Sequence, residues 1–233
     1  MGPDYDSYAA KMRAQTLDGT DLEVVARFTD MLCRRNSRIL DIGCGVGNTV
    51  NALRRLGHRG YGIDPTPQVL DVAAELFDGS WFRQLLANQL ALGSLDEHDL
   101  PRTYDAILLT GNVPAFISRD ELRGIFNLAD QVLSVTGVLV VGTTRHANGG
   151  PEDQDELREG TSLQLVQRFA DCHLAPYRSG SQWSVSVYAR TGQRSGFQSP
   201  DGIFILPPSL VAICETPPGI QQSASFSRPG IAA

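Results

Sequence analysis

Lysine, long apolar runs and closely spaced cysteines are scarce in this 233-residue chain. Lysine occurs once, at Lys11, and with a net charge of −6 and no dense basic face we expect no nucleic-acid partner. No run of about eighteen apolar residues occurs, and no basic segment followed by an apolar core opens the chain. We therefore expect neither a membrane span nor a leader, and a cytoplasmic location.

The four cysteines, Cys33, Cys44, Cys172 and Cys214, form no C-x-x-C pair and have no histidine at ligand spacing. This scatter is typical of neither a zinc site nor a disulfide framework, so we expect no metal. The length suits one large α/β domain with appendages.

The most informative stretch is Arg38–Pro65, which predicts a strand, a glycine loop, a helix and a second strand. The loop carries Gly43, Gly45 and Gly47, whose missing side chains leave backbone open to a ligand. The second strand ends on Asp64, and an acid at that place can accept both hydroxyls of a ribose. These features predict a nucleoside site.

The loop spacing separates kinds of nucleoside site. A dinucleotide fingerprint, G-x-G-x-x-G, would place glycine where Asn48 stands, and no Gly-Lys-Ser/Thr follows as in a P-loop. The tight loop, preceded by Asp41 and followed by Asp64, instead resembles the class I S-adenosylmethionine-dependent methyltransferases. The resemblance implies S-adenosyl-L-methionine as cofactor and transfer of its methyl group by in-line displacement.

The same resemblance assigns cofactor contacts. Asp41 and the three glycines would meet the methionine part, with Thr110 near that end, and Asp64 would hold the ribose. Many members place Asp beside a small residue after the third strand to bind the adenine amine. Here Ser94 and Leu95 stand at that place, with Asp96 as an alternative one residue later.

Alternating strand and helix patterns predict a parallel sheet covered on both faces. The expected elements are a helix from a Thr20–Glu23 capping box to about Arg35, a helix after Thr66, a third strand within Leu90–Leu95 after a short helix at Phe82–Asn88, a strand at Ala106–Leu109, a helix from the Ser118–Glu121 capping box, and a strand at Val138–Val141. Pro151–Ala170 is expected to be helical in its latter half. His173–Tyr177 and Trp183–Tyr188 predict an antiparallel hairpin.

The expected fold is therefore α/β: a doubly wound, Rossmann-like sheet of seven strands, mostly parallel, closed by an antiparallel C-terminal hairpin. Residues 1–19 would be an N-terminal segment, either frayed or a lid over the cofactor, and 20–190 the methyltransferase domain. Residues 191–233, rich in Pro, Gly and Ser, would be a tail.

The acceptor is the least defined part. An Asn-Pro-Pro-Tyr sequence, found in many amino-group methylases of DNA and protein, is absent, since Gly111–Pro114 occupies its place. This favours a small-molecule acceptor at oxygen or nitrogen. His146, in the loop after the fifth strand, is the candidate general base. The alternatives are a cofactor-binding, non-catalytic accessory subunit and an NAD-type oxidoreductase.

Overall fold

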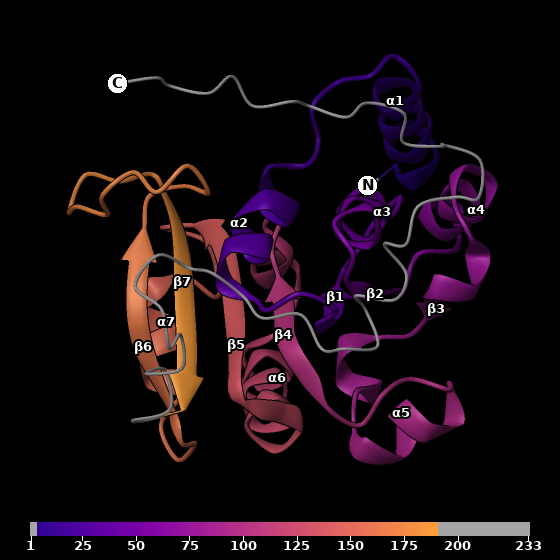
Figure 1. Cartoon of the computed structure of the whole chain (residues 1–233). Coiled ribbons are helices and arrows are strands. Elements are labelled where there is room, and N and C mark those ends of the chain that lie inside the picture. The colour runs from indigo at the N-terminus through magenta and orange to yellow at the C-terminus, as the bar shows by residue number, and fades with distance from the viewer. Residues whose placement is uncertain (1–3, 191–233) are drawn as a thin grey trace, which may run out of the picture.

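The computed structural model describes residues 4–190, which form one seven-stranded sheet between helical layers (Figure 1). The strand order is β3-β2-β1-β4-β5-β7-β6. The strands are β1 Arg38–Ile42, β2 Arg59–Asp64, β3 Phe82–Gln84, β4 Tyr104–Leu109, β5 Leu133–Thr144, β6 Leu163–Phe169 and β7 Trp183–Arg190. β1 to β5 pair in parallel, and β7 runs antiparallel to both β5 and β6. The expected mostly parallel sheet with an antiparallel C-terminal hairpin is confirmed.

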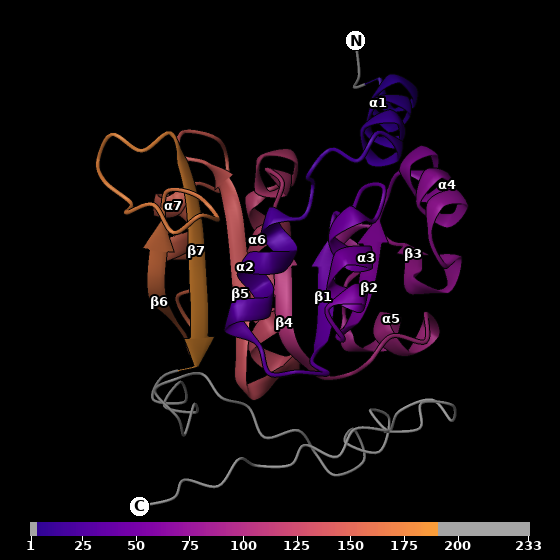
Figure 2. The ribbon, with the colours of Figure 1, turned by 45° about the horizontal axis from the view of Figure 1, so that its top comes forward.

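Helices cover both faces of the sheet (Figure 2). The α-helices are α1 Tyr5–Leu17, α2 Val24–Leu32, α3 Asn48–Arg55, α4 Pro67–Leu76, α5 Leu92–Glu97, α6 Arg119–Val132 and α7 Pro151–Leu157. Short 3-10 turns are η1 Gly79–Trp81, η2 Ala87–Gln89 and η3 Val113–Phe116. No helix of residues 4–190 is both long and apolar enough to cross a membrane.

Two apolar layers hold the helices to the sheet. On one face, Phe28 of α2 and Leu53 of α3 are buried against β1, β4, β5 and β7. On the other, Ile125 and Phe126 of α6 are buried with Tyr188 of β7, whose ring meets that of Phe126 edge to face at 5.2 Å. Parallel strands covered on both faces read as near-continuous apolar runs, as Ala106–Leu109 of β4 shows.

Several local predictions hold. Ser118 and Glu121 form the expected capping box: each side chain accepts from the other's backbone N–H. The predicted box at Thr20 is wrong. The Thr20 hydroxyl donates to Asp18, and α2 begins only at Val24 with Glu23 as its N-cap.

The predicted position of the third strand is wrong. Phe82–Gln84, expected to be helical, forms β3 beside β2, and the expected strand at Leu90–Leu95 is largely the helix α5. The last hairpin is also shifted. Leu163–Phe169, expected within a helix, is strand β6, whereas His173–Tyr177 makes only an isolated bridge at Pro176. The predicted tail at 191–233 lies outside the described residues.

Candidate active site

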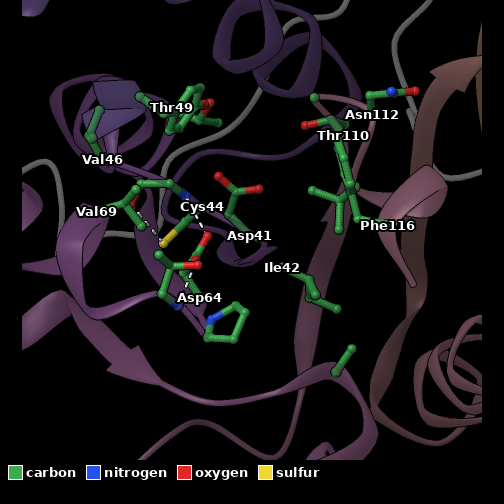
Figure 3. Close-up of a pocket in the computed structure, with 18 of the residues that line it drawn as sticks. Asp41, Ile42, Cys44, Val46, Thr49, Asp64, Val69, Thr110, Asn112 and Phe116 are labelled. Carbon is green, nitrogen blue, oxygen red and sulfur yellow. Dashed lines mark hydrogen bonds between the residues drawn. The ribbon is translucent and has the colours of Figure 1, made fainter. Parts of the chain in front are cut away.

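A cavity of about 650 Å³ lies at the carboxyl ends of β1, β2 and β4 (Figure 3). This is the edge where open α/β sheets bind ligands, and the volume suits a cofactor-sized molecule. Five predicted site residues line it: Asp41, Gly43, Gly45, Asp64 and Thr110. The sheet therefore brings together residues that are far apart in the sequence.

The three loop glycines all have positive φ, but they serve different purposes. A side chain on Gly43 would strike Val113 at 2.4 Å, and one on Gly47 would strike Phe82 at 2.5 Å. Gly45 is different, because a Cβ there would meet only the Tyr8 hydroxyl, at 3.8 Å, within 4 Å. Gly43 and Gly47 thus permit close packing, whereas Gly45 leaves backbone open to the cavity.

Asp64 is fixed by the backbone around it. Its Oδ2 accepts from the N–H of Gly45 at 3.0 Å, and its Oδ1 accepts from the N–H of Thr66 at 2.9 Å. The acid thus ties the glycine loop to the start of α4. Each carboxylate oxygen has a second lone pair that remains available to a ligand hydroxyl.

Asp41 is a buried acid on a central strand, with its carboxylate directed into the cavity (Figure 3). Burial, and then the negative charge of Asp64, raise the pKa of Asp41 from 3.8 to about 7. Two acids beside each other without a cation are unfavourable. A positively charged ligand would relieve this repulsion, so the site is suited to a cation.

The loop after β4 forms the opposite wall. Asn112 adopts a left-handed backbone, with φ of 70°, and leads into η3. Its side-chain oxygen accepts three hydrogen bonds from the end of β5: Thr143 Oγ1 at 2.9 Å, Thr144 N at 3.0 Å and Thr144 Oγ1 at 3.1 Å. This network holds Asn112 in one orientation.

The N-terminal helix closes the cavity on a further side. Tyr5, Tyr8 and Met12 of α1 line it. α1 is attached to the body by an ion pair between Arg13 and Glu75 and by a hydrogen bond from Thr16 to Asn48 at 3.1 Å. This placement supports the lid as a proposal for residues 1–19.

The structure places four other predicted residues outside the lining. Gly47 packs on Phe82, and His146 lies on an exposed turn after β5. Ser94 caps α5 through Ala91, and Leu95 is fully buried in the core. Leu85, Leu86 and Ala87, which follow β3, line the cavity in place of Ser94 and Leu95. Sequence reasoning misses this loop because it places the third strand too late.

Sequence reasoning also misses an apolar part of the lining. It comes from the start of α2 and the segment before it, and from η3 with the residue that follows it: Leu22, Val25, Val113, Phe116 and Ile117. No binding motif marks these apolar side chains, so the sequence does not predict them as site residues.

The residues fit S-adenosylmethionine, the cofactor that the resemblance implies. Gly45 offers open backbone, Asp41 is a buried acid that favours a cation, and Asp64 can accept ribose hydroxyls. The loop of Leu85–Ala87 supplies an apolar wall beside Asp64. The fold and the lining are suited to binding a nucleoside at the carboxyl edge of a doubly wound α/β sheet.

Comparisons with known proteins agree. A family model for a methyltransferase domain matches residues 40–139. No curated protein sequence matches at a significant level. A TehB-like S-adenosylmethionine-dependent methyltransferase from Corynebacterium glutamicum is 26% identical, with a TM-score of 0.71 over 80% of this chain and 97% of that chain.

Two more solved structures share the fold. The CcbJ methyltransferase from Streptomyces caelestis is 17% identical, with a TM-score of 0.62 over 72% of this chain and 88% of that one. The magnesium protoporphyrin IX methyltransferase from Synechocystis, solved with S-adenosylmethionine bound, is 14% identical, with a TM-score of 0.53 over 82% and 86%. The methyltransferase-domain match over residues 40–139 and these structural neighbours indicate a class I S-adenosylmethionine-dependent methyltransferase. This finding displaces the NAD-type oxidoreductase considered from the sequence.

Proposed function

We propose that the protein methylates a small molecule at an oxygen or nitrogen atom. The observation that carries this proposal is that the cavity extends past Asp41 and Asp64 to an apolar end formed by α2 and η3. That end, enclosed further by α1, offers room for an acceptor beside the cofactor residues. Ligand sites of this volume with a few polar groups on an apolar wall are typical of small-molecule binding.

The bound cofactor supplies a methyl group on a cationic sulfur, which is already a good leaving group. The protein's task is to align the acceptor with that methyl and to exclude water. We assign Asp41 and Gly45 to the charged methionine end, Asp64 to the ribose and Leu85–Ala87 to the adenine side. Thr110 and Asn112 face them from the end of β4 and would position the acceptor.

A general base is needed only if the acceptor must lose a proton during the reaction. His146 is the candidate from the sequence, and as a catalytic residue it stays a prediction. Its exposed position outside the cavity lining favours a mechanism in which the acceptor enters already deprotonated.

Two measurements test the proposal in sequence. Calorimetry should show binding of S-adenosylmethionine and of its demethylated product, and no heat at high micromolar ligand would refute the cofactor site. Labelled S-adenosylmethionine is then incubated with the protein and a small-molecule fraction of cell extract. A labelled small product supports the proposal. Binding without any labelled product would instead favour the accessory-subunit alternative, and label only in protein would refute the small-molecule acceptor.

A further inference from the structure

Asn112 is a polar residue whose hydrogen-bonding capacity is divided between the protein and the cavity. Its Oδ1 accepts from Thr143 Oγ1, Thr144 N and Thr144 Oγ1, all within 3.1 Å. The backbone N–H of Thr144 is a donor only, so the atom facing it must be the amide oxygen. The side chain therefore has one orientation, and its oxygen has no further capacity for a donor.

The amide nitrogen of Asn112, Nδ2, has different neighbours from the amide oxygen. Thr143 and Thr144, which hold the oxygen, are outside the cavity lining, whereas Asn112 itself lines the cavity. The Nδ2 atom makes no hydrogen bond to the part of the chain that the structure describes. In Figure 3 the amide nitrogen lies on the cavity side of the oxygen. Asn112 thus presents two N–H donors and no acceptor to the cavity.

Asn112 lies where its side chain can contact the methyl acceptor. Gly43 of the cofactor loop contacts Val113, so the residue before it stands next to that loop. Its left-handed backbone, which asparagine tolerates better than most residues, is held against strain by the three bonds to β5. A strained residue that its surroundings fix so completely is a feature of functional sites.

We propose that the atom methylated is an oxygen, of a phenol, enol or carboxylic acid, and that Asn112 Nδ2 donates a hydrogen bond to it. This inference rests on the proposed function and narrows it. An oxygen of that kind has one lone pair for Asn112 and another for the incoming methyl. A neutral amine has a single lone pair, which a donor such as Asn112 would occupy instead of orienting it.

The neighbouring groups agree with an oxygen on an apolar body. Glu121, the acid of α6 at this end of the cavity, already accepts from Ser118 through Oε2, from both its N–H and its hydroxyl. Large apolar side chains are exposed at the cavity: Phe116 at 76%, Leu86 at 44% and Tyr5 at 43%. Such exposed side chains on one lining mark a binding surface for an apolar ligand.

The step balances without any further reactant. The acceptor oxygen loses its proton to water before it enters, and the resulting anion is stabilised by the Asn112 donor. The O–C bond forms as the C–S bond breaks, and the electron pair of the broken bond remains on sulfur. The products are a neutral methyl ether or ester and the neutral thioether.

The test uses a matched pair of probes, 1-naphthol and 1-naphthylamine, which share a skeleton and differ in the acceptor atom. Binding to the full chain saturated with the demethylated cofactor is measured by NMR, and turnover with the ¹³C-methyl cofactor is measured by product analysis. We expect 1-naphthol to bind at least about tenfold more tightly and any product to carry an O-methyl group. Preference for the amine, an N-methyl product, or binding of neither probe would overturn the proposal.

The variant Asn112→Asp separates a positioning role from a structural one. It keeps an oxygen for Thr143 and Thr144 and tolerates the same backbone, but replaces the donor by an acceptor. We expect the variant to fold and to bind the cofactor, with the preference for naphthol lost or reversed. An unchanged preference would show that Asn112 is structural. Failure of the cofactor to bind the unmodified protein would instead refute the proposed function itself, and this control is read first.

Discussion

Replacing Asp41 by asparagine should make the ligand-free protein more stable at alkaline pH, although it removes a group of the candidate active site. The pKa of Asp41 is raised from 3.8 to about 7, first by burial and then by Asp64. Its contribution to stability is therefore fully present below pH 3.8 and is lost as the pH rises through about 7. Above that pH the ionised carboxylate destabilises the fold.

The size of the effect follows from the same values. At about 1.4 kcal/mol per pH unit, raising the pKa from 3.8 to about 7 makes ionised Asp41 cost about 4 kcal/mol above pH 7. Between about pH 5 and about pH 8 this cost grows by roughly 2–3 kcal/mol. The amide that replaces the carboxyl group in Asp41→Asn cannot ionise, so the stability gained by this substitution should grow by that amount over the same interval.

Urea unfolding at both pH values, followed by the fluorescence of Trp81 and Trp183, measures the difference. Asp71→Asn is the matched control, because Asp71 is an exposed acid on α4. The same two measurements on this variant give the baseline for removing a carboxylate from the surface. A stability difference between Asp41→Asn and the unmodified protein that is the same at both pH values would refute the reasoning, since it would mean that Asp41 is ionised throughout.

Three further predictions concern the ligand site. Affinity for S-adenosylmethionine should rise with pH through about 7 as Asp41 ionises, and calorimetry of Asp41→Asn should lack this dependence. Gly47→Ala should destabilise the fold by about 1–3 kcal/mol, because its Cβ meets Phe82 at 2.5 Å in addition to the strain of the positive φ. Gly45→Ala shares the backbone strain but has no close neighbour, so it should destabilise the fold less and also lower cofactor affinity by about tenfold; equal effects of the two substitutions in thermal melts and calorimetry would contradict this division. His146→Gln tests the predicted general base: a large loss in kcat across the pH range would support that role, and methyl transfer within about twofold of the unmodified protein would contradict it.

The sequence predicts the structure best where local and global signals agree. The unit from β1 to β2 is recognisable because its loop needs positive φ at Gly43, Gly45 and Gly47, a requirement that is visible in composition. Asp41 and Asp64 could be predicted as site residues because they lie on β1 and β2, the two strands of this unit. The same unit carries most of the predicted cofactor residues that the structure brings together.

The errors arise where tertiary contacts override local pattern. β3 has only three residues, too few for periodicity, and it exists because it pairs with Gly62–Asp64 of β2. In β6 the register shifts between Leu165 and Gln167, which breaks the alternation typical of a strand. The apolar end of the cavity could not be predicted, because its residues are defined by the packing of η3 and not by any motif.

The contact between Gly43 and Val113 has a consequence for anyone who redesigns this enzyme for new acceptors. Because Val113 occupies the space of the side chain that Gly43 lacks, a bulkier residue at 113 would push on the loop next to Asp41. Phe116, three residues later, is 76% exposed and has no such constraint. A library should therefore vary position 116 freely and leave 113 untouched.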